Sequence, residues 1–168
     1  MAEENSGANP AGADIELRIV GVRFEEPDYA PVLILREVAG NRVIPVWIGA
    51  AEAASISMQQ QGVVPDRPLS HDLHVELISA LGHSLDRVVL TRVDRGTFYA
   101  ELLVDGTTTI SARPSDAVAI ALRAAVPVFA RPGVLEEVGI NLDAEGEVDV
   151  EAFKEFLDHV SPEDFLDD

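Results

Sequence analysis

The chain has 168 residues, with 30 acidic side chains against 12 Lys and Arg, a net charge of −18, and no cysteine. This length suits one domain, which buries about 70% of the surface that its unfolded chain exposes and so forms a core without cross-links. The composition excludes a disulfide framework, a zinc–cysteine site and a thiol nucleophile, and the charge argues against a simple nucleic-acid binder, because phosphate backbones are bound chiefly by Lys and Arg.

Residues 1–13 are rich in Gly, Ala, Asn and Glu, which predicts a disordered lead-in. This segment lacks the basic and then apolar character of a secretory signal, and no apolar run approaches the roughly 18 residues of a membrane helix. We therefore predict a cytoplasmic protein that does not enter a membrane. A domain is expected over residues 14–140, followed by an acidic tail over residues 141–168.

The first half of the domain predicts three strands and then two helices. Apolar alternation and apolar runs place the strands over residues 15–21, 31–38 and 43–48. Pro45 suits a sheet edge or a strand end, because proline cannot donate a hydrogen bond to the ladder. The helices are predicted over residues 49–61 and 70–81, the second with Ser70 as its N-cap and an apolar stripe of leucines and Ile78.

The second half predicts a β-meander, a helix and two short elements. Residues 85–112 contain three β-like runs separated by the turn sequences DRG and DGT. A third helix is predicted over residues 114–125, a last strand at residues 128–129 and a short helix over residues 132–138. Because strands and helices interleave without regular βαβ alternation, the predicted class is α+β, a single compact domain with a mixed, largely antiparallel sheet and three main helices.

The acidic charge is concentrated at the two ends of the chain. The net charge is −5 for residues 1–40, −2 for residues 41–130 and −11 for residues 131–168. Apolar residues at helical spacing after Asp149 also predict an amphipathic helix in the tail. Because the middle is nearly neutral, any contact with nucleic acid is expected to use a few placed arginines.

Two segments place Arg-Pro just ahead of a predicted helix start. They are RPLSHD, residues 67–72, and RPSD, residues 113–116. Proline keeps the preceding Arg extended, so its guanidinium stays near the unpaired backbone N–H groups of the helix start. Each segment is either an anion cradle or an ordinary capped helix start, and the sequence leaves both interpretations open.

Several side chains near these helix starts can carry proton or metal chemistry. His71, beside Asp72, is either a general acid or base near neutral pH or a capping histidine. The carboxylates of Glu52, Asp72 and Asp116 either bind a divalent cation through oxygen ligands or serve solubility alone. His71 and His74 share one helical face, but no third metal ligand follows in register.

Four motifs occur in a fixed order. They are IPVWIGAAEA (residues 44–53), RPLSHDL (67–73), TFYAEL (97–102) and ARPSDAVAIALR (112–123). Together they resemble the bifunctional nuclease domain family, over roughly residues 15–138. The resemblance implies a compact α+β domain that is often oligomeric, with a dimer expected here, and a hydrolase that cleaves both DNA and RNA.

The resemblance points to eight positions but does not settle a mechanism, and their roles are those that a nuclease would give them. The positions are Glu52, Arg67, His71, Asp72, Arg113, Ser115, Asp116 and Arg123. His71, Asp72 and Asp116 would be catalytic. The substrate would be bound by Arg67, Arg113, Ser115 and Arg123. Glu52, Asp72 and Asp116 would bind Mg²⁺ or Mn²⁺. Two positions depart from the family pattern, because Ser70 stands where Thr is more common and His74 where the family usually has another residue.

Three functions remain open at this point. The chain could hydrolyse phosphodiester bonds in DNA and RNA, with arginines on the phosphates and His71 as general base or acid. It could instead be a non-enzymatic module that recognises an anionic ligand or a protein partner. In the third case the arginines only pair with Glu52, Asp72 and Asp116 inside the fold, which fixes geometry without chemistry.

Overall fold

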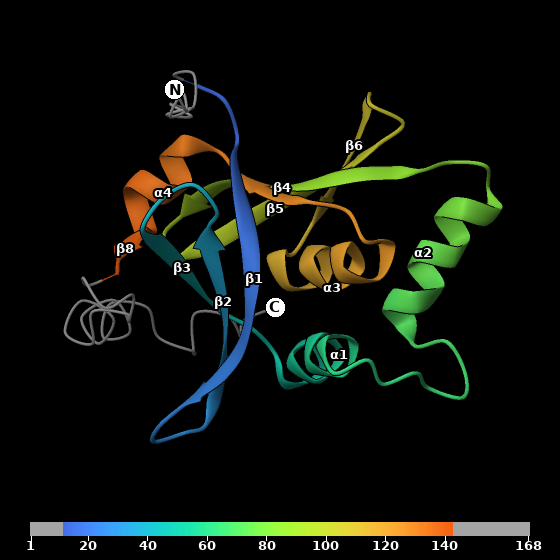
Figure 1. Ribbon diagram of the computed structural model, residues 1–168, viewed down its shortest axis with the longest axis horizontal. Coiled ribbons are helices and arrows are strands. Elements are labelled where there is room, and N and C mark those ends of the chain that lie inside the picture. The colour runs from blue at the N-terminus through green and yellow to red at the C-terminus, as the bar shows by residue number, and fades with distance from the viewer. Residues whose placement is uncertain (1–11, 143–168) are drawn as a thin grey trace, which may run out of the picture.

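Eight strands form one mixed sheet in the computed structural model, which describes residues 12–142 (Figure 1). In chain order the elements are β1 (Ile15–Glu25), β2 (Ala30–Glu37), β3 (Arg42–Trp47), α1 (Ala50–Gln60), α2 (Ser70–Ala80), β4 (Leu85–Asp94), β5 (Thr97–Val104), β6 (Thr108–Ala112), α3 (Pro114–Ala124), β7 (Val128–Ala130), α4 (Pro132–Val138) and β8 (Ile140–Asn141). The predicted α+β class and mixed sheet are confirmed. The predicted tail helix and nearly all of the predicted lead-in lie outside the described residues.

The sheet consists of two antiparallel units joined by the short strand β7. The strand order is β6-β5-β4-β7-β1-β2-β3-β8, and β4–β7 is its one parallel pair within residues 12–142. In β7, Val128 lies opposite Val88 of β4 on one side and Leu17 of β1 on the other. Strand β7, which directly precedes the short helix α4 in the sequence, therefore lies in the middle of the sheet.

Pro45 lies where its missing N–H costs no sheet hydrogen bond. It faces Ile34 of β2, whereas on the other side of β3 the strand β8 reaches only Arg42 and Val43.

Among the described residues no helix is long and apolar enough to cross a membrane.

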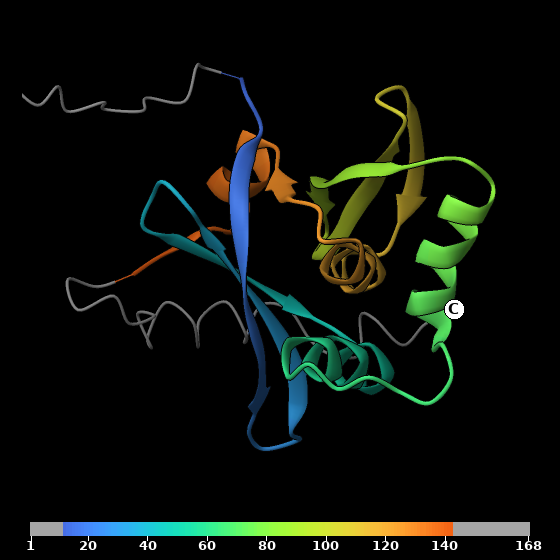
Figure 2. The same cartoon turned by 45° about the vertical axis from the view of Figure 1, so that its right-hand side comes forward.

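Helix α3 is buried by its neighbours on several sides. It packs against α1, α2, β4 and β5, and the two views show it between the other two long helices and the β4–β5 strands (Figures 1 and 2). The five consecutive residues from Ala117 to Ala121 are all buried. A helix that is apolar on all sides belongs inside a protein, and its alanines let neighbouring helices approach closely.

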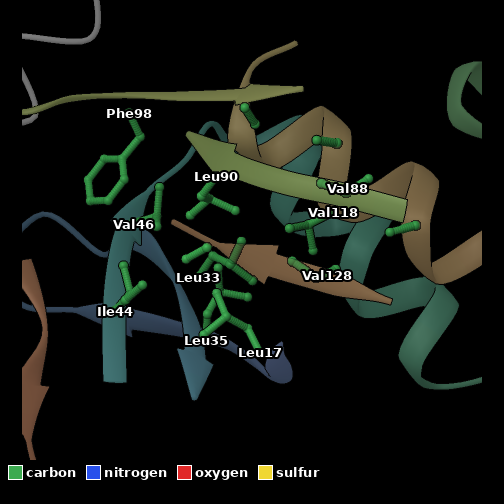
Figure 3. Close-up of a cluster of buried hydrophobic side chains, with 14 of the residues drawn as sticks. Leu17, Leu33, Leu35, Ile44, Val46, Val88, Leu90, Phe98, Val118 and Val128 are labelled. Carbon is green, nitrogen blue, oxygen red and sulfur yellow. The ribbon is translucent and has the colours of Figure 1, made fainter. Parts of the chain in front are cut away.

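The main core lies between the sheet and helices α1 and α3. Leu33 and Leu35 of β2 meet Leu90 of β4 and Val118 of α3 there, and all four are fully buried (Figure 3). Burial of each such side chain contributes about 1.5–3 kcal/mol to the stability of the fold. This core holds the N-terminal ends of α1 and α3 in fixed relative positions.

Helix α2 packs differently, because none of its residues is fully buried. Val75 and Ile78 face inward together with His71 and Asp72, while the leucines at positions 69, 73, 77 and 81 are exposed. The predicted N-cap at Ser70 is wrong by one residue. Leu69 is the N-cap, and its backbone N–H donates to Oδ2 of Asp72 at 2.8 Å. The Asp72 carboxylate, and not a serine hydroxyl, is therefore the side-chain hydrogen-bond acceptor at this helix start.

Candidate functional site

The first turns of α1, α2 and α3 surround a cavity of about 660 Å³. Glu52 and Ser55 of α1, His71 of α2, and Arg113 and Asp116 at the start of α3 line it, and β5 and β6 contribute apolar side chains. Helix starts attract negative charge, because their first backbone N–H groups have no partner within the helix. Neither α1 nor α3 has a side-chain cap, so both starts keep this character.

Arg113 connects the walls of this cavity. Pro114 is the first residue of α3, and Arg113 before it is extended, as the Arg-Pro pair predicts. Its Nε donates to Oδ2 of Asp116 at 2.7 Å, and its Nη2 donates to Oδ1 of Asp116 at 3.1 Å and to Oε1 of Glu52 at 2.7 Å. The guanidinium thus binds two carboxylates while its side chain remains 66% exposed, so a phosphate can also reach it.

Gly49 is the N-cap of α1, and its lack of a side chain lets Glu52 reach Arg113. The Glu52 carboxylate occupies the space next to Gly49 that a β-carbon would need. The backbone of Gly49 is extended, with φ of −75° and ψ of 158°, so it requires glycine for this close approach and not for a left-handed conformation.

His71 forms a hydrogen-bonded chain with Ser55 and Asp116. Its Nε2 lies 3.0 Å from Oδ1 of Asp116, and its Nδ1 lies 2.8 Å from Oγ of Ser55. An ionised carboxylate only accepts, so Nε2 carries a proton, and in the neutral ring Nδ1 then accepts the Ser55 hydroxyl proton. This is the connectivity by which a carboxylate orients a histidine base towards a hydroxyl or water.

Asp72 and Arg123 form a second, more enclosed pair behind the cavity. Nε of Arg123 donates to Oδ1 of Asp72 at 2.6 Å, and its two terminal nitrogens donate to the backbone oxygens of Ala119 (3.0 Å) and Ser55 (3.2 Å). The Arg123 side chain is only 6% exposed. This pair connects α2, α3 and α1, which is the fold-holding role that the third interpretation of the sequence describes.

The electrostatics keep both aspartates ionised. Burial raises the pKa of Asp116, but hydrogen bonds and positive charge from Arg113 and His71 outweigh burial, and the pKa lies below its ordinary value. Burial likewise raises the pKa of Asp72, and the Leu69 N–H and Arg123 bring it below the ordinary value. The same bonds to Asp116 raise the pKa of Arg113, so all three groups carry full charge at neutral pH.

The carboxylates do not fit a three-ligand metal centre in this arrangement. Within residues 12–142 there is no group of three His, Cys, Asp or Glu side chains that could hold a metal ion. Asp72 is paired with Arg123 behind the cavity, and the Arg113 guanidinium lies between Glu52 and Asp116, where a shared cation would have to bind. Binding of Mg²⁺ or Mn²⁺ by these residues stays a prediction.

The structure thus brings together Glu52, His71, Arg113 and Asp116, with Asp72 and Arg123 behind them. Arg67 does not join this group, because it is exposed and forms no ion pair among the described residues. Ser115 is buried and lines a neighbouring cavity. The catalytic and substrate-binding roles predicted for a nuclease stay predictions. All three guanidinium nitrogens of Arg123 already donate hydrogen bonds within the fold.

Sequence reasoning missed Ser55. This serine is only 7% exposed and sits inside an otherwise apolar helix stretch, so it looks like a neutral helix residue. The available signal was its spacing, because residues three apart share one face of a helix and Ser55 follows Glu52 by three. Its pairing with His71, 16 residues away, depends on how α1 and α2 pack.

Comparison with known proteins agrees with the motifs. The family model of the bifunctional nuclease domain matches residues 33–143, which include every residue of the site. Two proteins from Mycobacterium tuberculosis, one from strain CDC 1551 and one from strain H37Rv, are each 52% identical over 159 residues. These alignments cover 89% of this chain and 97% of each relative, and both relatives are named only as uncharacterized proteins.

Proposed function

The chain belongs to the bifunctional nuclease domain family, and on that basis we propose that it hydrolyses phosphodiester bonds in DNA and RNA. Family membership supports a nuclease-related function, and the cavity supplies groups suited to that reaction. These are a cationic side chain that remains exposed, a histidine with an orienting carboxylate, and two helix starts without side-chain caps.

The observation that carries the proposal is the Ser55–His71–Asp116 chain beside Arg113. A water molecule at Ser55 Oγ would give its proton to that oxygen while the serine proton moves to His71 Nδ1. Asp116 stabilises the imidazolium that forms, through the 3.0 Å contact to Nε2. The water oxygen then bonds to phosphorus, the phosphorus–oxygen bond to the leaving sugar breaks, and the imidazolium returns its proton to that oxygen.

Arg113 would bind the phosphate during this reaction. A guanidinium matches two phosphate oxygens and offsets the negative charge that grows on them. Glu52 and Asp116 hold the guanidinium at the cavity mouth. Water is the proposed nucleophile in preference to Ser55, because this side chain is nearly buried and its hydroxyl and backbone oxygen both have partners.

Cleavage of a fluorescent single-stranded DNA and RNA by the full chain tests the proposal. We expect His71→Ala to lower kcat/KM by roughly 10²- to 10⁴-fold and Asp116→Asn by a similar factor, with the fold retained by circular dichroism. Ser55→Ala should lower it less than His71→Ala, since water can then contact His71 directly. His83→Ala and Asp105→Asn are matched controls, because this exposed pair, 2.6 Å apart, lies outside the cavity.

The same assay separates the remaining alternatives. Loss of activity with EDTA and recovery with Mg²⁺ or Mn²⁺ would support the predicted metal, and would mean that Arg113 leaves its position between Glu52 and Asp116. A folded wild-type chain that cleaves neither nucleic acid with any divalent metal or pH would refute the nuclease. If that chain still gains thermal stability from anionic ligands through Arg113, the binding-module interpretation replaces it.

A further inference from the structure

A second cavity of about 470 Å³ lies beside the first. It is bordered by the end of β3, the start of β5 and the N-terminal ends of α1 and α3, and the residues that line it include Trp47 and Phe98. Its volume is within the roughly 300–1,000 Å³ range of small-molecule sites. Nothing in the proposed hydrolysis uses this cavity.

Arg113 lines both cavities. Its guanidinium binds Glu52 and Asp116, and the residue lines the second cavity together with Pro114 and Ser115. A ligand whose phosphate binds Arg113 can therefore extend an attached group into the second cavity. In a nucleotide, that attached group is a sugar with its base.

The walls of the second cavity suit a flat heterocyclic ring. Trp47 is the partly exposed aromatic residue of this lining, and bases stack on aromatic side chains because every base has a π face. Phe98 and Pro114 are buried and close the cavity with apolar surface behind it. The hydroxyl-bearing residues Thr97 and Ser115, and the backbone of Gly49 at the start of α1, line the same space and supply polar groups. Aromatic walls with a few polar groups are typical of sites that orient one ring-shaped ligand.

We infer that this second cavity binds a nucleobase of the strand whose phosphate is held at Arg113. This inference rests on the proposed nuclease function and adds to it a subsite for the substrate. The base is bound mainly by its aromatic face, so cleavage is expected to depend little on which base is present.

Trp47 makes the test direct, because it is the single tryptophan of the whole chain. Adenosine 5′-monophosphate has no phosphodiester bond to cleave, so it can be titrated into the full chain while tryptophan fluorescence is recorded. We expect saturable quenching that free adenosine competes away. Ribose 5-phosphate, which lacks the base, should neither quench the fluorescence nor displace the nucleotide at the same concentrations.

A cavity-filling variant provides the second arm. Ala50 is exposed, begins α1 and lines the cavity, so Ala50→Leu fills part of the space without disturbing the core. We expect it to raise the Kd for the nucleotide at least tenfold. Ala80→Leu, the same change at an exposed helix position outside both cavities, should leave the Kd unchanged. Ala30→Leu on another wall is the substitute if Ala50→Leu does not fold.

Absence of saturable quenching, an unchanged Kd in the cavity-filling variant, or equal displacement by ribose 5-phosphate would each overturn the inference. These results are separable from those of the cleavage assay. Base-dependent binding by a chain that cleaves nothing refutes the nuclease and leaves the base site standing. Cleavage without base-dependent binding refutes only the base site.

Discussion

The contact between Gly49 and Glu52 shows how one missing side chain positions the arginine of the site. A β-carbon at position 49 would collide with the Glu52 carboxylate, which is the flexible end of a side chain and can move away. Arg113 would then keep Asp116 as its carboxylate partner and lose Glu52.

We therefore expect Gly49→Ala to lower kcat/KM by the same factor as Glu52→Gln, while the unfolding free energy changes by less than about 1 kcal/mol. The two changes combined should have no additional effect, because both remove one interaction. Gly133→Ala is the matched control, since a β-carbon there meets nothing within 4 Å. Fully additive effects of Gly49→Ala and Glu52→Gln would contradict this account.

Asp116 should also make stability depend on pH in the acid range. Its pKa in the folded protein lies below the ordinary aspartate value of 3.8, because Arg113 and His71 outweigh the effect of burial. The unfolded chain then binds a proton more readily, so the carboxylate stabilises the fold above the unfolded pKa, and this contribution disappears as pH falls through the folded pKa.

Urea unfolding of the wild type and of Asp116→Asn between pH 3 and 6 checks this expectation. The stability difference that favours the wild type should shrink as the pH falls below about 4. A difference that stays constant over this range would show that the carboxylate has the same pKa in the folded and unfolded chains.

At the scale of elements, the short strand β7 connects the two halves of the sheet although it has only three residues. It joins the β1–β2–β3 unit to the β4–β5–β6 unit, and its contact with β4 brings Val128 against Val88, which is fully buried. Because α3 packs on β4 and β5, this junction also fixes where the site residues of α3 lie.

We expect Val88→Ala to destabilise the protein by roughly 2 kcal/mol, from about 0.8 kcal/mol for each of two buried methyl groups plus a cavity term. The same change at Val20, a β1 residue that is 45% exposed, should stay within about 0.5 kcal/mol. Equal effects of the two substitutions in chemical denaturation would contradict the central position of this strand pair.

Element types were predictable because periodicity and turn residues act locally. The strand runs, the meander at residues 85–112 and the Arg-Pro helix start at Arg113 all occur as predicted. The inward face of α2 was harder to predict, because its leucines are exposed and the polar His71 and Asp72 face inward. Hydrophobic periodicity cannot anticipate a helix whose inner face is used for hydrogen bonds.

At the scale of the whole molecule, helix α2 presents an apolar stripe that no described residue covers. Leu69, Leu73, Leu77 and Leu81 recur every four residues and are 37%, 49%, 48% and 73% exposed. Two copies of this helix packed antiparallel about a two-fold axis would cover each other, since such an interface pairs a surface with itself. The acidic side chains of this segment are Asp72, which is paired with Arg123, and Glu76.

We therefore predict that the chain forms the expected dimer through α2. Light scattering should give a dimer mass for the wild type and a monomer mass for the double change Leu73→Glu and Leu77→Glu. Val38→Glu, an equally exposed apolar position outside the helix, should leave the dimer intact. A wild type that remains monomeric at 100 µM would refute the prediction.

The sequence by itself determined the α+β class, the Arg-Pro helix start at Arg113 and the family, because local periodicity, backbone restriction by proline and motif order do not depend on the rest of the chain. Tertiary structure alone decided that Arg113 binds Glu52, 61 residues away, that Asp116 orients His71, 45 residues away, and that Arg67 and Ser115 lie apart from them. The physical reason is that these pairings depend on how α1, α2 and α3 pack against the sheet. That packing is fixed by contacts between distant residues of the core, including the junction at β7, and such contacts leave no local pattern in the sequence.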